Sequence, residues 1–202
     1  MKAAYTKPFV LIAVILIVDQ LIKTWVRTHI ALDYGEIRIL GEHGKLQYTL
    51  NNGMAFGWEI GGEGGKLILT IFRILAVGAI GCGLVYLIKH KYHRGLIICV
   101  TLIFAGALGN IIDSTFYGLI YQHRKLFEGQ VVDMFHFPLF SGTWPSWFPG
   151  LGGKGFTFFD PIFNLADASI SVGVIAILLF QKRYFKREHP EPAAPNSEMV
   201  EE

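Results

Sequence analysis

Four long apolar runs constrain the fold of this 202-residue chain more than any other feature. They predict helices at about 8–26, 67–88, 96–113 and 161–180, each about as long as a helix must be to cross a bilayer. Since 52% of the residues are hydrophobic and only 17% are charged, the composition is too apolar for an ordinary soluble domain. The sequence therefore predicts a mainly α-helical integral membrane protein with a four-transmembrane-helix bundle.

The first run has an alternative interpretation as a cleavable signal peptide. Its helix-compatible pattern continues through Trp25, and no small-residue cleavage site follows. Hydropathy therefore favours a membrane helix here.

Basic residues predict how the four helices are oriented. Residues 1–7, 89–95 and 181–187 together hold nine Lys or Arg and no Asp or Glu. Because short loops rich in Lys and Arg stay in the cytoplasm, we expect both termini to be cytoplasmic. The longer loops, 27–66 and 117–160, are then external.

The two external loops differ in character. Segments 37–40 and 46–50, separated by Gly41 and Gly44, predict a small β-rich surface subdomain. The second loop ends in an aromatic, glycine-rich stretch that suits the headgroup level of a membrane. We expect a membrane domain over residues 1–187, followed by a disordered, Pro-rich and acidic cytoplasmic tail at 188–202.

Polar residues inside or beside the apolar runs are the candidates for function. Asn164 and Asp167 lie three apart, hence on one helix face, and a carboxylate in lipid needs a partner or a function. Asn110 and Asp113 lie near the outer end of the third helix. Asp19 lies in the outer half of the first helix.

Asp133 precedes the fourth helix by a loop that can return to the same depth. Two or more carboxylates can therefore converge near the outer leaflet boundary. Two carboxyl groups close together in a low dielectric cannot easily both ionise, so one holds the proton. Such a pair can polarise a peptide carbonyl and activate a water, as aspartic proteases do.

Structural interpretations of the same residues stay open at this point. Asp113 can face water or pair with Arg73, Asp19 can form an intrahelical pair with Lys23, and Asp133 can be a solvated loop residue. His136 is better explained as interfacial than as a metal ligand. The two cysteines and seven histidines form no disulfide or zinc pattern, and a net charge of +2 does not suggest nucleic acid.

Five blocks in order resemble the lipoprotein signal peptidase (signal peptidase II) family. These are residues 19–23 (DQLIK), 51–56 (NNGMAF), 106–113 (GALGNIID), 131–135 (VVDMF) and 163–170 (FNLADASI). They span nearly the whole folded part of the chain. Each is weak alone, but the set in this order is highly specific.

The resemblance implies an intramembrane aspartic endopeptidase of the bacterial inner membrane, active near its outer face. It would cut diacylglyceryl-modified prolipoproteins before the lipidated cysteine, without a metal or cofactor. It also implies contact with membrane lipids and inhibition by globomycin; we expect a monomer. The implied catalytic pair is Asp133 and Asp167. The implied supporting residues are Asp19, Lys23, Asn51, Gly53, Asn110, Asp113, Asn164 and Ala166.

Two departures from the family pattern stand out. The family often has Arg directly after the position of Asp113, whereas this chain has Ser114, so Arg73 or Arg124 would have to supply the cation. The insertion at 138–158 predicts a lid or a membrane-surface float. A proton-coupled transporter subunit and a structural assembly factor are the rival functions.

Overall fold

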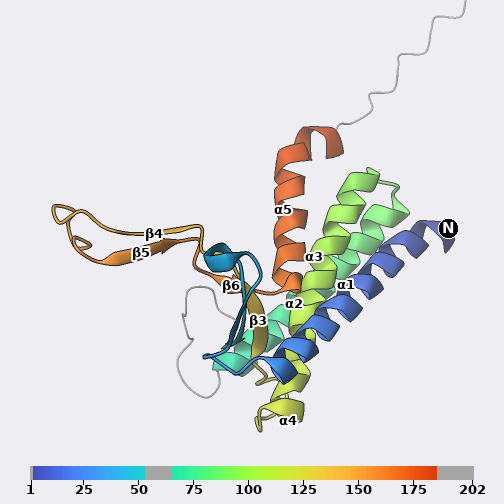
Figure 1. Ribbon diagram of the computed structural model, residues 1–202. Helices are drawn as coiled ribbons and strands as arrows, with labels where there is room; N and C mark the ends of the chain where they lie inside the picture. Colours follow the sequence, from blue (N-terminus) through green and yellow to red (C-terminus); the bar gives the residue numbers. More distant parts are fainter. Residues whose placement is uncertain (1, 53–64, 186–202) are drawn as a thin grey trace, which may run out of the picture.

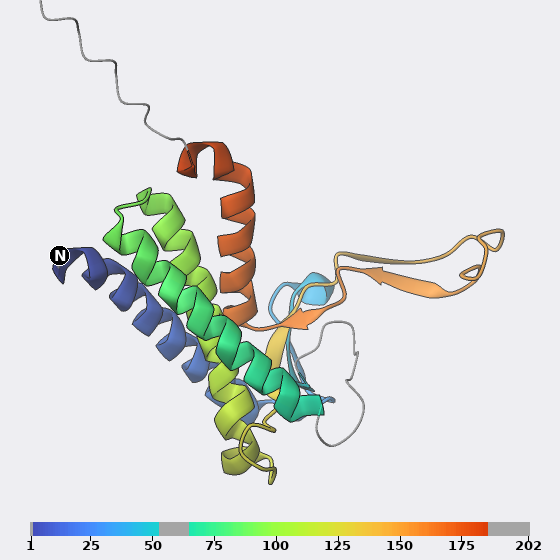
Figure 2. The same ribbon diagram turned by 180° about the vertical axis from the view of Figure 1, so that it is seen from behind.

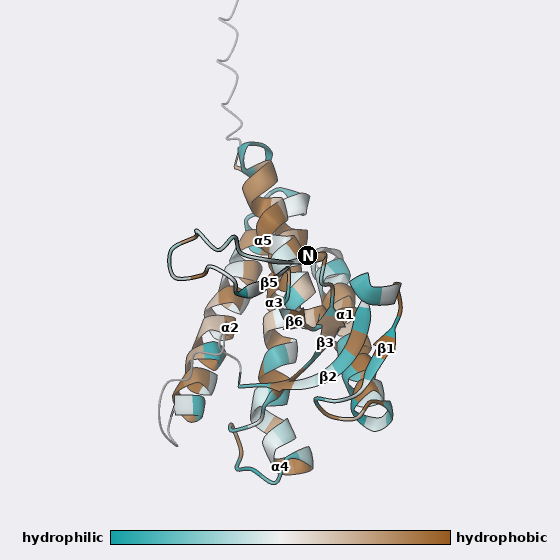
Figure 3. Ribbon diagram, turned by 60° about the vertical axis from the view of Figure 1, so that its left-hand side comes forward, coloured by the Kyte–Doolittle hydropathy of each residue, from teal (hydrophilic) through white to brown (hydrophobic). Residues whose placement is uncertain are grey.

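The computed structural model describes residues 2–52 and 65–185. Its long helices are α1 (Lys2–His29), α2 (Gly65–Lys89), α3 (Arg94–Ile112) and α5 (Leu165–Tyr184). Within the described residues, four helical segments are long and apolar enough to cross a membrane: Tyr5–His29, Gly65–Lys89, Arg94–Tyr121 and Leu165–Tyr184. The prediction of a helical membrane bundle is confirmed, and Figure 3 shows the apolar character of these helices.

Helix α3 is the centre of the bundle and packs against α5, α1 and α2. The contact with α5 depends on a glycine, because a Cβ atom added at Gly106 would lie 2.2 Å from the backbone oxygen of Ala166. Small residues of this kind let two membrane helices approach closely. The start of α5, which carries Asp167, is thereby held directly against α3.

The antiparallel sheet beside the bundle has the order β1-β2-β3-β6. Its strands are β1 (Glu36–Arg38), β2 (Lys45–Asn51), β3 (Val131–His136) and β6 (Ile162–Phe163). The predicted pair of strands in the first external loop is therefore present, with the short 3-10 turn η1 (Gly41–His43) between them. Strands from the second external loop extend it, which the sequence did not indicate.

Figures 1 and 2 show that the sheet lies near the end of the bundle where α5 begins. The start of α1, the turn between α2 and α3, and the end of α5 lie toward the opposite end. A separate two-stranded hairpin, β4 (Phe140–Thr143) with β5 (Gly155–Phe158), projects sideways from the sheet.

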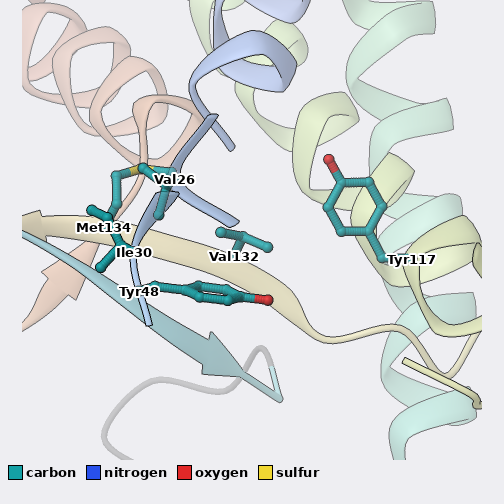
Figure 4. Close-up of a cluster of buried hydrophobic side chains, with 6 residues drawn as sticks. All are labelled: Val26, Ile30, Tyr48, Tyr117, Val132 and Met134. Carbon is teal, nitrogen blue, oxygen red and sulfur yellow. The ribbon is translucent and has the colours of Figure 1, made fainter. Parts of the chain in front are cut away.

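A small apolar core fixes the sheet to the bundle (Figure 4). Val26 of α1 and Ile30, which directly follows α1, belong to one cluster of buried side chains with Val132 and Met134 of β3. Because side chains alternate along a strand, Asp133 points to the other face of β3. Residues 131–134 are all buried, so this strand is covered on both faces.

Two of the helix boundaries that differ from the prediction affect the site. The third membrane helix continues past Asp113 through a π-helical turn, η3 (Asp113–Tyr117), into α4 (Gly118–Tyr121). Asp113 is therefore inside a helical segment, whereas the sequence predicted a helix end. The fourth helix begins at Leu165 and not at residue 161, because Ile162 and Phe163 pair with β3.

Candidate active site

Asp133 and Asp167 meet at the side chain of Asn164. The Asn164 Nδ2 atom donates to Asp133 Oδ1 over 2.7 Å. Asn164 Oδ1 accepts the backbone N–H of Asp167 over 2.9 Å, and Asp167 Oδ2 accepts the backbone N–H of Asn164 over 3.3 Å. The second pair of bonds is a capping box at the start of α5. One residue thus caps the helix and joins the two acidic side chains.

The strand pairing explains why Asn164 reaches Asp133. Phe135 of β3 pairs with Phe163 of β6 in an antiparallel register. Asn164 follows directly after β6, so it emerges beside the part of β3 that carries Asp133. The short strand therefore sets the distance between the two carboxyl groups, and a helix running from residue 161 would not have done so.

Two further asparagines hold the outer oxygens of the pair. Asn110 Nδ2 donates to Asp167 Oδ1 over 2.7 Å, and Asn51 Nδ2 donates to Asp133 Oδ2 over 2.9 Å. Asn110 Oδ1 in turn accepts from Asn164 Nδ2 over 3.2 Å. Amide donors fix the orientation of both carboxyl groups without adding a charge. The mutual repulsion of the two carboxylates is therefore retained.

Burial makes Asp133 a weak acid. Only 2% of Asp133 is exposed, and this desolvation raises its pKa to about 7, with the negative charge of Asp167 as the second cause. The hydrogen bonds from Asn51 and Asn164 lower the pKa and offset part of the effect. Asp167 is only partly buried. The two acids of the pair therefore occupy unequal environments.

A buried ion cluster lies beside the pair. Lys23 Nζ lies 2.8 Å from Asp19 Oδ2 and 2.8 Å from Asp113 Oδ2, and all three residues are fully buried. Lys23 Nζ also donates to Asn110 Oδ1 over 3.5 Å. Two carboxyl groups therefore share one ammonium in the buried interior. The cluster connects α1 and α3 to the residues that hold Asp167.

Backbone and uncharged groups complete this cluster. Gln20 Nε2 donates to Asp113 Oδ1 over 2.9 Å, and the Tyr117 hydroxyl donates to Gln20 Oε1 over 2.9 Å. The backbone N–H of Ala166 donates to Asp19 Oδ1 over 3.1 Å. The first turn of α5 is thereby bonded to α1 as well as packed on α3.

Arg73 of α2 lies beside Ser114, the residue that departs from the family pattern. Its Nη1 atom donates to Ser114 Oγ over 3.1 Å. Its guanidinium is attracted by Asp167, Asp133 and Asp113. Of the two cations suggested by the sequence, the structure therefore places Arg73 beside Ser114.

The structure brings together all but one of the residues singled out from the sequence. Gly53 lies outside the described residues. Asp113 is fully buried and does not face water, and it forms an ion pair with Lys23. The intrahelical Asp19–Lys23 pair is present. Gln20 and Tyr117 were not singled out, although a glutamine within the first apolar run was a usable signal.

Comparisons with known proteins agree with this arrangement. A family model described as "Signal peptidase (SPase) II" matches residues 11–182. The chain belongs to the signal peptidase II family. A lipoprotein signal peptidase from Porphyromonas gingivalis is 40% identical over 210 residues, covering 93% of this chain and 91% of that protein. One from Amoebophilus asiaticus is 41% identical over 171 residues, covering 81% and 72%.

Comparison with solved structures shows that this signal peptidase II family member is also similar to known membrane enzymes in its fold. A bacterial membrane enzyme superposes with a TM-score of 0.61 and 25% sequence identity, over 92% of this chain and 94% of the other. A second one gives a TM-score of 0.59 at 25% identity, over 87% and 92%. The chain is thus a member of a peptidase family with the fold of a multi-pass membrane enzyme.

Proposed function

We propose that this chain is an intramembrane aspartic endopeptidase that removes signal peptides from diacylglyceryl-modified bacterial prolipoproteins, cutting before the lipidated cysteine. The observation that carries the proposal is the pair Asp133 and Asp167, bridged by Asn164. The names of the related proteins supply the substrate class. The carboxyl pair supplies a chemistry that can hydrolyse an amide without a nucleophilic side chain.

The pair works as one unit that holds a single proton. Burial and the neighbouring charge keep the proton on the pair near neutral pH. The ionised carboxyl group takes a proton from a water, which attacks the scissile carbonyl. The protonated carboxyl group donates a hydrogen bond to the carbonyl oxygen. As the C–N bond breaks, a carboxyl group of the pair passes its proton to the leaving amine.

The surrounding residues position the pair and do not react. The asparagines 51, 110 and 164 fix the two carboxyl groups through hydrogen bonds. The cluster of Lys23, Asp19 and Asp113 holds α1, α3 and the first turn of α5 in register. We infer that these residues orient the two carboxyl groups, since they contact the pair or the residues that hold it.

The charge distribution supports a site near the outer face of the bacterial inner membrane. The start of α1, the turn between α2 and α3, and the end of α5, where Lys and Arg gather, lie opposite the sheet, so we assign both termini to the cytoplasm. A lipidated substrate then enters sideways between helices, with its acyl chains remaining in the bilayer. The protein acts as a monomer, and a globomycin-type cyclic peptide blocks it.

Cleavage of a purified precursor tests this function. The full chain in nanodiscs should shorten a diacylglyceryl-modified prolipoprotein on a gel and should leave the same precursor without lipid uncut. Asp133→Asn and Asp167→Asn should each abolish cleavage. Asp160→Asn is the matched control, because this exposed aspartate contacts His136 and not the pair. Normal turnover by either dyad variant, in folded protein, would overturn the assignment.

A further inference from the structure

The hairpin β4–β5 is an amphipathic ribbon. Phe140 pairs with Phe158, and Ser141 pairs with Thr157 in the next rung. Because paired residues share a face and successive rungs alternate, the two faces differ in chemistry. The aromatic face carries Phe140, Phe156 and Phe158. The hydroxyl face carries Ser141, Thr143 and Thr157.

The aromatic face is built from rings in contact, of which Phe140 and Phe158 are exposed and Trp144 and Phe156 are partly buried. Phe140 and Phe158 stack with centroids 4.9 Å apart, and Trp144 lies 5.1 Å from Phe156. Phe140 is 55% exposed, Phe158 is 52% exposed and Trp147, near the tip, is 76% exposed. A two-stranded hairpin is marginally stable in water. An uncovered aromatic face of this kind indicates a contact surface.

The hydroxyl face adjoins charged groups. Ser141 Oγ and Thr157 Oγ1 are 3.1 Å apart. Both residues line a cavity of about 290 Å³ at the root of the hairpin, together with Glu42, Lys45 and Asp160 and with the edge residue Phe140. Lys45 forms ion pairs with Glu42 and with Glu36 of β1. This side of the ribbon is therefore suited to water.

The root of the hairpin lies close along the chain to the start of the membrane helix α5. Its root residue Asp160 lies five positions before Leu165, the first residue of α5, and five residues reach at most about 18 Å. The ribbon runs across the direction of α5 and not along it (Figures 1 and 2). Between residues 137 and 159 the sequence has Lys154 as its single charged side chain.

We propose that the aromatic face of this hairpin lies in the interface of the lipid bilayer, at the end of the bundle where the candidate site lies. The occupant is the headgroup and upper acyl region of the lipid. Aromatic side chains favour this level because they combine an apolar ring with tolerance of nearby water. The hydroxyl face, with its adjoining ion pairs, faces the aqueous side.

Such an attachment holds the sheet that carries Asp133 against the membrane. Strand β3 ends only four residues before β4, and β6 follows the hairpin on its other side. Both neighbours of the hairpin are therefore strands of the site's own sheet. This is an attachment to lipid, and it stands whether or not the dyad performs the chemistry proposed above.

Fluorescence quenching by lipid tests the attachment directly. In vesicles of phosphatidylethanolamine and phosphatidylglycerol, a variant retaining Trp147 as its only tryptophan should lose most of its emission when brominated acyl chains are introduced. Bromines near the headgroup should quench more than bromines near the bilayer centre. A variant retaining only Trp25, which is 42% exposed on α1, provides the reference for a residue on a membrane helix.

Opposite faces of the same ribbon provide the matched variants. Phe140→Ser with Phe158→Ser should move Trp147 into water, seen as red-shifted emission and quenching by acrylamide. Ser141→Ala with Thr157→Ala should leave its lipid quenching unchanged. The same double substitutions in the variant that retains only Trp25 should leave its quenching unchanged, which verifies that the bundle is intact. Acrylamide quenching without lipid quenching in the unmodified hairpin would overturn the proposal. The proposal would also be overturned if the protection of Trp147 from acrylamide disappeared as the protein was diluted in lipid. In that case a second copy of the chain, and not lipid, would cover the aromatic face.

Discussion

The side-chain amide of Asn164 donates to Asp133 over 2.7 Å, while its carbonyl oxygen caps the helix that carries Asp167. Asn164 is fully buried, so neither bond competes with water. The relative position of the two carboxyl groups is thus set by one side chain whose two ends serve different elements. This relationship allows the positioning and capping roles of Asn164 to be separated.

The substitution Asn164→Ser should separate these two roles. A serine still caps α5, whereas its short side chain does not span the distance to Asp133. We expect kcat to fall about 100-fold, the order found when a reacting group is misplaced by about 1 Å. Asn164→Ala should add a capping loss of about 1 kcal/mol. Parallel measurement of kcat and thermal unfolding in detergent checks both; an undiminished kcat for Asn164→Ser would refute the positioning role.

Stability should depend on pH through Asp133. Its pKa rises from an ordinary 3.8 to about 7 on folding, so the folded state binds this proton more tightly than the unfolded state. The stability that this group contributes is therefore fully present below about pH 4 and is lost as the pH rises through about 7. Asp133→Asn removes this loss. The Tm of the variant minus the Tm of native protein should therefore increase from pH 4 to pH 8. The corresponding change in unfolding free energy is roughly 2–4 kcal/mol.

The comparison with Asp160→Asn makes the pH test specific. Asp160 has a side chain that is 66% exposed, so its replacement should give no comparable trend. In activity assays, a pair that needs one proton should lose turnover as the pH rises above about 7. A flat difference in Tm between Asp133→Asn and native protein across this range would contradict the burial argument.

Removing the lysine of the buried cluster should be far more damaging than removing a surface lysine. Lys23→Met leaves Asp19 and Asp113 buried together without their cation, which should cost about 3–5 kcal/mol. Lys45→Met removes two ion pairs at the surface of the sheet, where the loss of stability should be much smaller. Chemical denaturation in matched micelles measures both. Similar losses for the two variants would show that Lys23 does not neutralise the cluster.

Arg73 should contribute to turnover through its charge. Its guanidinium is attracted by Asp167 and Asp133 and hydrogen-bonds Ser114. We expect Arg73→Gln to lower kcat about ten- to 100-fold, less than the loss of a donor in direct contact with the reacting oxygen. Ser114→Ala should have a small effect, because Arg73 keeps its charge. Arg124→Gln is the control for a removed cation on the exposed surface; an equal loss there would make the effect nonspecific.

The sequence by itself determined the membrane bundle and most of the residues now found around the site. Runs of apolar residues demand helices in lipid, because each backbone polar group must be bonded within the segment. A carboxylate in such a run is costly, so Asp19 and Asp167 were identifiable without coordinates. The family resemblance added Asp133, which local pattern could not distinguish from a solvated loop residue.

Only the tertiary structure decided how these residues meet. The apolar character of residues 161–163 predicts helix, yet two of them pair with β3, and this pairing brings Asn164 to Asp133. The choice of Lys23 over Arg73 as the partner of Asp113 likewise depends on which helices pack together. Hydropathy reports the cost of leaving water, which is a property of each residue. Register and ion pairing depend on neighbours far along the chain, and those are fixed only when the strands and helices pack.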